Sequence, residues 1–152
     1  MLKLGRRFAA AWLASSEGLS VRQDNALESF QISDSLKAVL WAGSDMIHSP
    51  VAMDVDAKGR VWVTEDLQHS GVQNAPHARI KILADTDNDG RADTVKIFGP
   101  TFSSKPLGIS VFDNVIVVSM APNIHVFTDL NRDDVFDPKV DKEEIIAKGF
   151  HG

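Results

Sequence analysis

The sequence predicts an all-β fold, namely a partial β-propeller of about two four-stranded blades with calcium-type loops on its hairpins. Three observations support this prediction. An acidic loop occurs twice, and the two copies begin 44 residues apart, at Asp85 and Asp129. Short apolar runs with strand-like alternation flank both copies. A hairpin unit that begins with proline also occurs twice, at Pro50 and Pro106. Repeats of roughly 40–50 residues built from short strands are typical of propeller blades.

The N-terminal part of the chain is predicted to lie outside the propeller. Residues 1–17 resemble a signal peptide, because basic residues precede the apolar run 8–14 and small serines follow it. An ordinary amphipathic helix is the alternative. Residues 18–35 are polar without a sustained period, which predicts a linker or a short helix. The propeller is then expected to span 36–152, to begin with a strand at 36–42 and to be truncated at its C-terminal end.

Each predicted blade begins with a hairpin. The first spans residues 50–64 around a turn at 57–59, with alternating apolar and polar residues on both sides of the turn. The second spans residues 106–119 around a turn at 113–114, where aspartate and asparagine tolerate left-handed backbone angles. The residues expected to fill the core of the first blade are Met53, Val55, Val61, Val63, Ile80 and Ile82.

The first blade contains an insertion. Its hairpin unit precedes the second one by 56 residues, which exceeds the spacing of the acidic loops by 12. The additional residues fit in the polar stretch 65–78, which has no counterpart in the second blade. Insertions between the strands of a repeat usually lie on one face, often the binding face. Glu65, His69 and His77 are therefore candidates for a site at a channel mouth. Exposed loop histidines without a chemical role are the alternative.

The first acidic loop has the composition of a calcium site. Its carboxylates stand at alternate positions, and Gly90 at the sixth position permits a sharp reversal of the backbone. Several carboxylates held close together repel one another unless a cation binds them. An EF-hand would have a glutamate at the twelfth position, where this chain has Lys96, so a hairpin version of the loop is expected. A solvated Asp-Gly turn without metal is the alternative. The predicted ligands are Asp85, Asp87, Asp89, the carbonyl of Arg91, and Asp93.

The second acidic loop departs further from the calcium pattern. Asn131 replaces a carboxylate, and Asp134 replaces the glycine. Aspartate can adopt the left-handed backbone angle needed there, at some energetic cost. In either loop a metal is expected to be structural, because it would tie together a hairpin of modest apolar content. The predicted ligands are Asp129, Asn131, Asp133 and Asp137.

The composition excludes several classes of function. The net charge is −5 and the chain has no lysine- or arginine-rich tract, so nucleic acid is not an expected partner. The chain has no cysteine, which excludes disulfides, thiolate metal sites and a haem-attachment motif in this sequence. No apolar run reaches the length of about 18 residues that a membrane span needs. The sequence also has no serine elbow, phosphate-binding glycine loop or zinc pattern.

Three stretches together resemble one family, namely residues 45–65, 79–93 and 148–152. They are similar to the N-terminal propeller of large exported proteins of planctomycete-type bacteria, labelled membrane-bound dehydrogenase-like or haem-binding. That propeller is in turn similar to the glucose/sorbosone dehydrogenase group, which uses pyrroloquinoline quinone (PQQ). The resemblance implies oxidation of a sugar or alcohol, a periplasmic or cell-surface location, and a haem domain far downstream. It also implies a catalytic histidine in a later blade, beyond the last residue of this sequence.

Two functions follow as hypotheses. In the first, the chain is the N-terminal fragment of an exported propeller protein resembling quinone-dependent sugar dehydrogenases, and it is inactive alone. In the second, the chain is a non-catalytic, calcium-stabilised propeller module that binds protein or carbohydrate. A propeller needs about four to eight blades to close, so further blades or self-association are expected in both cases.

Overall fold

The computed structural model describes residue 27 and residues 30–67, 78–102 and 104–149. Within these residues the chain forms strands and no helix, which confirms the predicted all-β fold. The strands are β1 (Pro50–Val55), β2 (Val61–Asp66), β3 (Ala78–Ala84), β4 (Thr94–Phe102), β5 (Pro106–Phe112), β6 (Val115–Met120), β7 (Asn123–Thr128) and β8 (Lys142–Lys148).

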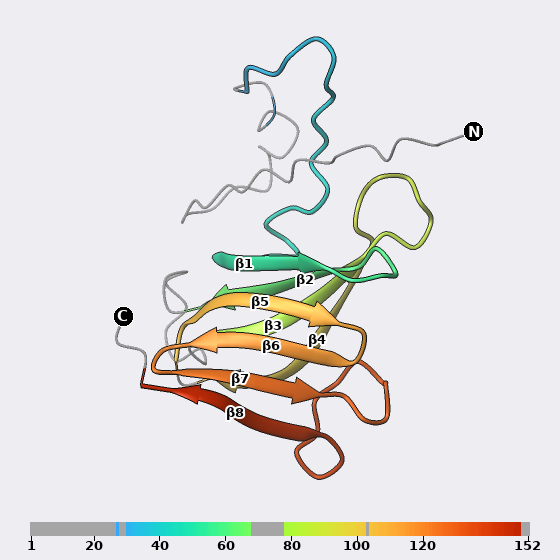
Figure 1. Cartoon of the computed structure of the whole chain (residues 1–152). Helices are drawn as coiled ribbons and strands as arrows, with labels where there is room; N and C mark the ends of the chain where they lie inside the picture. Colours follow the sequence, from blue (N-terminus) through green and yellow to red (C-terminus); the bar gives the residue numbers. More distant parts are fainter. Residues whose placement is uncertain (1–26, 28–29, 68–77, 103, 150–152) are drawn as a thin grey trace, which may run out of the picture.

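The strands form two four-stranded antiparallel sheets, with orders β1-β2-β3-β4 and β5-β6-β7-β8. Each strand pairs with the next strand in the sequence, so each sheet is a meander, as in a propeller blade. Figure 1 shows the second sheet lying over one face of the first. The structure is therefore consistent with the partial propeller of about two blades that was predicted. We call the sheet β1–β4 the first blade and the sheet β5–β8 the second blade.

The hairpin turns lie where the sequence predicts them. In the first blade, the turn closes with hydrogen bonds from Asp56 N to Arg60 O and from Gly59 N to Asp56 O, both 3.0 Å long. Gly59 has a φ of 81°, which glycine adopts without strain. In the second blade, Asp113 has a φ of 57° and forms the two-residue connection together with Asn114. Both turns thus use residue types that tolerate left-handed backbone angles.

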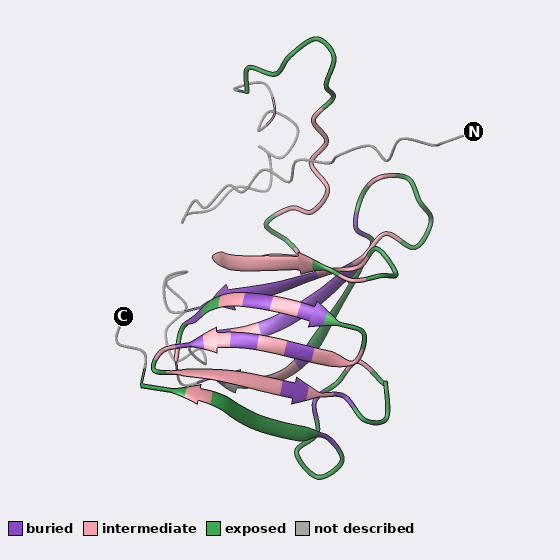
Figure 2. Ribbon diagram, in the orientation of Figure 1, coloured by how far each residue is buried: buried purple, intermediate pink, exposed green. Residues whose placement is uncertain are grey.

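The main core lies between the two blades. Successive residues of a strand point to opposite faces, and alternate residues of β5 and β6 are accordingly buried (Figure 2). Aromatic rings meet edge-on in this core, with centroids 5.1 Å apart for Trp62 and Phe98 and also for Phe127 and Phe136. Its buried members are Trp62, Ala78, Ile80, Ile82, Phe98, Phe102, Ile109, Val111, Ile116, Val118, Met120, Phe127 and Phe136.

A second, smaller core lies on the other face of the first blade. Buried Val63 and Leu83 pack there against partly buried apolar residues of the segment 41–47, among them Trp41 and Met46. This segment contains no strand, so the strand predicted at 36–42 is wrong. Its apolar side chains are buried against the face of a sheet, and its backbone does not join a sheet edge.

One of the predicted core residues is misplaced. Val55 is 51% exposed and does not belong to the core, contrary to the prediction. It is the last residue of β1 and adjoins the exposed turn residues 57–59. The other predicted core residues are buried or partly buried, as expected: Met53, Val61, Val63, Ile80 and Ile82.

The insertion lies between β2 and β3. Residues 67–77 connect these strands, whereas only Ala121 and Pro122 connect β6 to β7 in the second blade. Residues 68–77 lie outside the described residues, as do the predicted signal peptide at 1–17 and much of the predicted linker at 18–35. In the described part of the chain, no helix is long and apolar enough to cross a membrane.

Candidate functional site

The first acidic loop gathers three of its predicted ligands. It connects β3 to β4, and one carboxylate oxygen from each of Asp85, Asp87 and Asp89 lies within 4.8 Å of the other two. Backbone donors hold these carboxylates in place: Asp85 accepts hydrogen bonds from Asp89 N at 3.2 Å and Gly90 N at 2.9 Å. The left-handed φ values of Asn88, 60°, and Gly90, 92°, curl the backbone around the three side chains. Hard carboxylate oxygens at this spacing fit a calcium ion.

The other two predicted ligands of this loop have different contacts. Asp93 Oδ2 accepts hydrogen bonds from Thr86 N at 2.8 Å and Thr86 Oγ1 at 2.7 Å, so this carboxylate closes the base of the loop. These hydrogen bonds from Thr86, with a further one from Asp87 N, hold the pKa of Asp93 below its usual value. Arg91 donates its backbone N–H to Asp89 Oδ1 at 2.8 Å. The structure therefore groups the carboxylates of Asp85, Asp87 and Asp89, and Asp93 stabilises the loop beside them through its hydrogen bonds to Thr86.

The second acidic loop repeats this backbone path. Asp134 N donates to Asp129 Oδ2 at 2.9 Å, as Gly90 N does to Asp85 in the first loop. Val135 N donates to Asp133 Oδ1 at 2.9 Å. The φ values of Arg132, 59°, and Asp134, 60°, are left-handed at the positions of Asn88 and Gly90. The replacement of glycine by aspartate has therefore not changed the fold of the loop.

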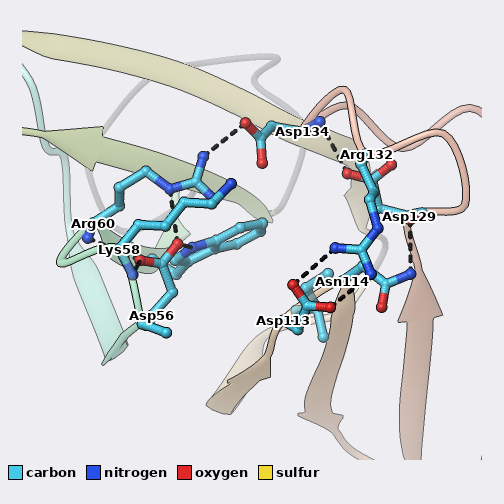
Figure 3. Close-up of a pocket in the computed structure, with 11 residues that line it drawn as sticks. Asp56, Lys58, Arg60, Asp113, Asn114, Asp129, Arg132 and Asp134 are labelled. Atoms are coloured by element: carbon cyan, nitrogen blue, oxygen red, sulfur yellow. Dashed lines mark hydrogen bonds and ion pairs between the residues drawn. The ribbon is translucent and has the colours of Figure 1, made fainter.

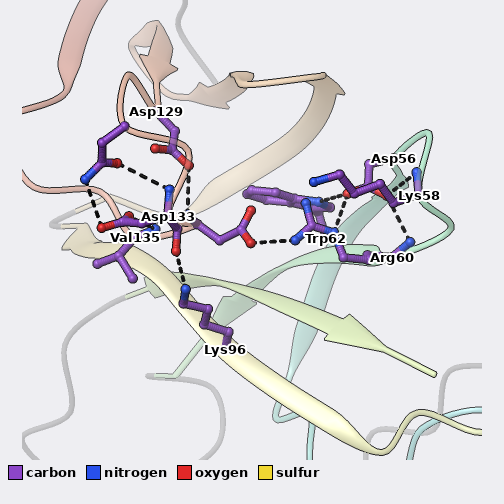
Figure 4. Close-up of polar contacts among 10 residues, drawn as sticks. Asp56, Lys58, Arg60, Trp62, Lys96, Asp129, Asp133 and Val135 are labelled. Atoms are coloured by element: carbon purple, nitrogen blue, oxygen red, sulfur yellow. Dashed lines mark hydrogen bonds and ion pairs between the residues drawn. The ribbon is translucent and has the colours of Figure 1, made fainter. Parts of the chain in front are cut away.

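The burial of Asp129, a ligand predicted from the sequence, is the feature of the second loop that sequence reasoning did not reveal. The residue is only 3% exposed, and its Oδ1 atom is buried without a hydrogen-bond partner among the described residues. A buried acceptor left unsatisfied costs about 1–3 kcal/mol, and more when it is charged. Figure 4 shows Asp129 and Asp133 in the same loop, where the Asp133 carboxylate accepts hydrogen bonds from Asn131 Nδ2 and Val135 N. A bound cation is one way to satisfy Asp129 Oδ1, so the second loop is a candidate metal site although its sequence departs further from the calcium pattern.

In the second loop, Asp141 takes the place that Asp93 has in the first loop. Its Oδ1 accepts a hydrogen bond from Leu130 N at 2.8 Å, as Asp93 accepts one from Thr86 N. Its Oδ2 accepts another from Asp137 N at 2.8 Å. Asp137 is thus part of a longer return to β8, in which its Oδ1 caps Lys139 N. Counting residues from Asp129 pointed to Asp137, because the counting assumed two loops of equal length.

Glu65, proposed from the sequence for a channel mouth, is fully buried and ion-paired. Its Oε2 lies 2.6 Å from Arg79 Nε and its Oε1 lies 3.1 Å from Lys81 Nζ. Its Oε1 also accepts the backbone N–H of His48 at 2.6 Å. Burial lowers the pKa of Lys81, and the negative charge of Glu65 opposes that shift. These contacts anchor the segment before β1 on the first blade; His69 and His77 lie outside the described residues.

A polar cavity of about 90 Å³ lies between the two blades. Figure 3 shows the turn of the first blade on one side of it and the turn and acidic loop of the second blade on the other. Arg60 spans it, with Nε 2.7 Å from Asp56 and Nη1 2.7 Å from Asp134. Arg132 pairs with both carboxylate oxygens of Asp113, at 2.8 and 2.6 Å. The charges of the cavity are thus largely paired with one another.

The pKa shifts in this cavity follow from the ion pairs. Burial lowers the pKa of Arg60, but its hydrogen bonds to Asp134 and Asp56 outweigh burial and raise it. The hydrogen bond and charge of Arg132 lower the pKa of Asp113. Both arginines and Asp113 are therefore charged at neutral pH, and the Arg60–Asp134 pair joins the first blade to the second.

A comparison with curated proteins and with solved structures gave no match. A family model does match the chain, over residues 22–152, and its description is "Domain of unknown function (DUF7133)". The matched range includes both blades, both acidic loops and the segment that covers the first blade. The chain belongs to the DUF7133 domain family.

Proposed function

We propose that this chain is a calcium-binding pair of propeller blades, a non-catalytic module whose acidic loops are stabilised by metal. The observation that carries this proposal is the grouping of Asp85, Asp87 and Asp89, whose carboxylate oxygens lie within 4.8 Å of one another. The buried, unpartnered oxygen of Asp129 supports a second site of the same kind. Calcium suits these loops better than magnesium, because calcium accepts irregular sets of about six to eight oxygen ligands.

Calcium would supply structural stability here. Each loop joins the last two strands of a blade, so a metal that fixes the loop also fixes the register of those strands. The loop residues orient the ligands themselves, because their backbone N–H groups donate to the carboxylates from within the loop. Export to the periplasm or the cell surface fits this role, since extracellular calcium reaches concentrations that fill sites of modest affinity.

The test is the calcium dependence of thermal unfolding. At a calcium concentration a hundredfold above Kd, one site adds about 2.7 kcal/mol of stability, which corresponds to a Tm rise of about 5–10 °C for a chain of this size. A chelator should reverse the rise. Asp85→Asn should reduce it, whereas the same charge change at exposed Asp34 should leave it unchanged. A melting curve that is identical in calcium and in chelator would refute the proposal.

A second candidate function is favoured by the resemblance of residues 45–65, 79–93 and 148–152 to the propeller of membrane-bound dehydrogenase-like proteins, which is in turn similar to quinone-dependent dehydrogenases. In this case the two blades would belong to a larger oxidoreductase that uses PQQ and acts on a sugar or alcohol. Glu65 would then hold neighbouring strands in position and would not contact the substrate, because its carboxylate is already paired with Arg79 and Lys81. A PQQ titration distinguishes the candidates: this chain alone should show neither an absorbance change nor activity. A longer protein that contains these blades should show both, and failure to do so would favour the non-catalytic module.

A further inference from the structure

The second acidic loop also forms polar contacts between the first blade and the second. Three groups of the first blade contact it. Arg60 Nη1 lies 2.7 Å from Asp134 Oδ2, and Lys96 Nζ donates to the backbone carbonyl of Asp133 (Figure 4). The carbonyl of Phe98 in β4 accepts the N–H of Phe136. All three contacts fall on loop residues 133–136, a range that begins at the predicted metal ligand Asp133.

Packing brings the loop as close to β4 as the backbone permits. A Cβ atom at Gly99 would lie 2.6 Å from Phe136 Cβ, so the glycine is needed for this approach. The Phe136 side chain is buried in the main core, with its ring centroid 6.3 Å from that of Phe98. A shift of the loop backbone would therefore disturb both the hydrogen bond to Phe98 and the packing between the blades.

Other residues of the first blade fix the position of the Arg60 side chain that contacts Asp134. Asp56 Oδ2 accepts hydrogen bonds from Arg60 Nε at 2.7 Å and from Trp62 Nε1 at 3.0 Å. The guanidinium also lies over the Trp62 ring, 5.7 Å from its centroid. Arg60 thus meets Asp134 from a fixed position, and the order of the loop decides whether Asp134 is in place.

The same loop contains the buried, unsatisfied oxygen of Asp129. Asp129 Oδ2 accepts the N–H of Asp134, so the predicted metal ligand and the residue that contacts Arg60 are joined directly. We propose that a cation bound at the second loop through Asp129 and Asp133 latches the two blades together by ordering residues 133–136 against the first blade. This inference rests on the proposed calcium binding. It gives the second loop a role in joining the blades that the first loop does not have.

In the part of the chain that the structure describes, the first loop makes no such contacts with another blade. Gly90 stands at the position of Asp134 and has no side chain that could bind an arginine. Ala92, at the position of Phe136, donates its N–H to the carbonyl of Trp41 at 2.7 Å, in the segment before β1. A cation in the first loop would therefore order its own hairpin and that segment. The contrast supplies a matched control, because Asp85 and Asp129 hold equivalent positions in the two loops.

The experiment is hydrogen exchange measured by mass spectrometry on the full chain, with calcium and with chelator. In the wild-type chain, calcium should slow exchange about tenfold in residues 85–93 and 129–137, and also in the turn 56–62, which contacts the second loop through Arg60. Asp129→Asn should abolish the effect in 129–137 and in the turn, and leave it in 85–93. Asp85→Asn should abolish the effect in 85–93, and leave it in 129–137 and in the turn. Arg60→Gln, which removes no predicted ligand, should abolish the calcium effect in the turn and leave it in 129–137.

The possible failures are distinct. If calcium changes exchange in neither loop, the proposed calcium binding is wrong, and the latch fails with it. If calcium protects both loops but leaves the turn 56–62 unchanged in the wild-type chain, calcium binds and the latch is refuted. If Asp85→Asn abolishes the effect on the turn as fully as Asp129→Asn does, the latch is also refuted. The wild-type and Arg60→Gln measurements decide the question even if Asp129→Asn fails to fold.

Discussion

At the scale of single residues, Asp56 connects a turn to the interface between the blades. Its Oδ1 accepts the N–H groups of Lys58 and Arg60, each at 2.9 Å, and its Oδ2 binds the side chains of Arg60 and Trp62. Burial raises the pKa of Asp56, but the hydrogen bonds from Trp62 and Arg60 and the charge of Arg60 outweigh it and lower the pKa. The ionised carboxylate is therefore a stabilising group of the folded chain.

The lowered pKa of Asp56 predicts a specific loss of stability in acid. The unfolded chain binds this proton at about pH 3.8, so the contribution is complete above that pH and disappears as the pH falls through the lower folded pKa. Asp56→Asn should cost about 1–3 kcal/mol of unfolding free energy at about pH 6, and less at about pH 3. Urea unfolding followed by tryptophan fluorescence measures both values. Asp34→Asn is the control, and an Asp56→Asn deficit of equal size at both pH values would contradict the argument.

At the scale of elements, the two acidic loops dock in the same way on different surfaces. The eighth residue of each loop donates its N–H to a carbonyl of the preceding layer: Ala92 to Trp41, and Phe136 to Phe98 of β4. The segment 41–47 thus occupies, for the first blade, the place that β4 occupies for the second. This explains why an apolar segment without strand structure is a fixed part of the fold.

Much of the fold follows from local sequence signals, whereas the contacts between elements do not. Alternating residues and turn residues predicted the first hairpin of each blade and the acidic-loop hairpins, because strand periodicity and turn chemistry are local properties. The residues 36–42 have the apolar content of a strand, and only tertiary packing decides that Trp41 and Ala42 cover a sheet face. For the candidate site, the carboxylate spacing predicted the grouping of Asp85 with its neighbours. The burial of Asp129 and the hydrogen bonds of Asp141 to the loop backbone depend on the length of the loop and on its packing against the first blade. Counting residues in the sequence does not predict either.

The covering role of the segment 41–47 predicts the effect of truncating Trp41. Trp41→Ala should lower the unfolding free energy by about 2 kcal/mol, less than a fully buried tryptophan, because Trp41 is only partly buried against Val63 and Leu83. Urea unfolding followed by circular dichroism measures the change without depending on the deleted fluorophore. Leu36→Ala, at a residue that is 64% exposed, should change stability by less than about 0.5 kcal/mol. Equal effects of the two substitutions would show that the segment does not stabilise the blade.

At the scale of the whole molecule, the two blades present equivalent faces with unequal burial. Lys96 pairs with Ile82 in the first blade, and Glu144 pairs with Val126 in the second, so Phe98 and Ile146 hold the same place in their sheets. Phe98 is fully buried between the blades, whereas Ile146 is 63% exposed. The outer face of the second blade is therefore built like a surface that another sheet covers in the first blade. Apolar sheet faces of this kind are typical interaction surfaces.

We expect this face to drive association of the isolated chain. Sedimentation velocity should show a sedimentation coefficient that rises with concentration, because burying Ile146 and its apolar neighbours removes their surface from water. Ile146→Lys should suppress the rise, since a lysine placed in such an interface would have to bury its charge. Leu36→Lys adds the same charge at a residue of similar exposure in another part of the chain and should leave the association unchanged. A wild-type coefficient independent of concentration, or equal effects of the two lysines, would show that the outer face of the second blade does not drive self-association.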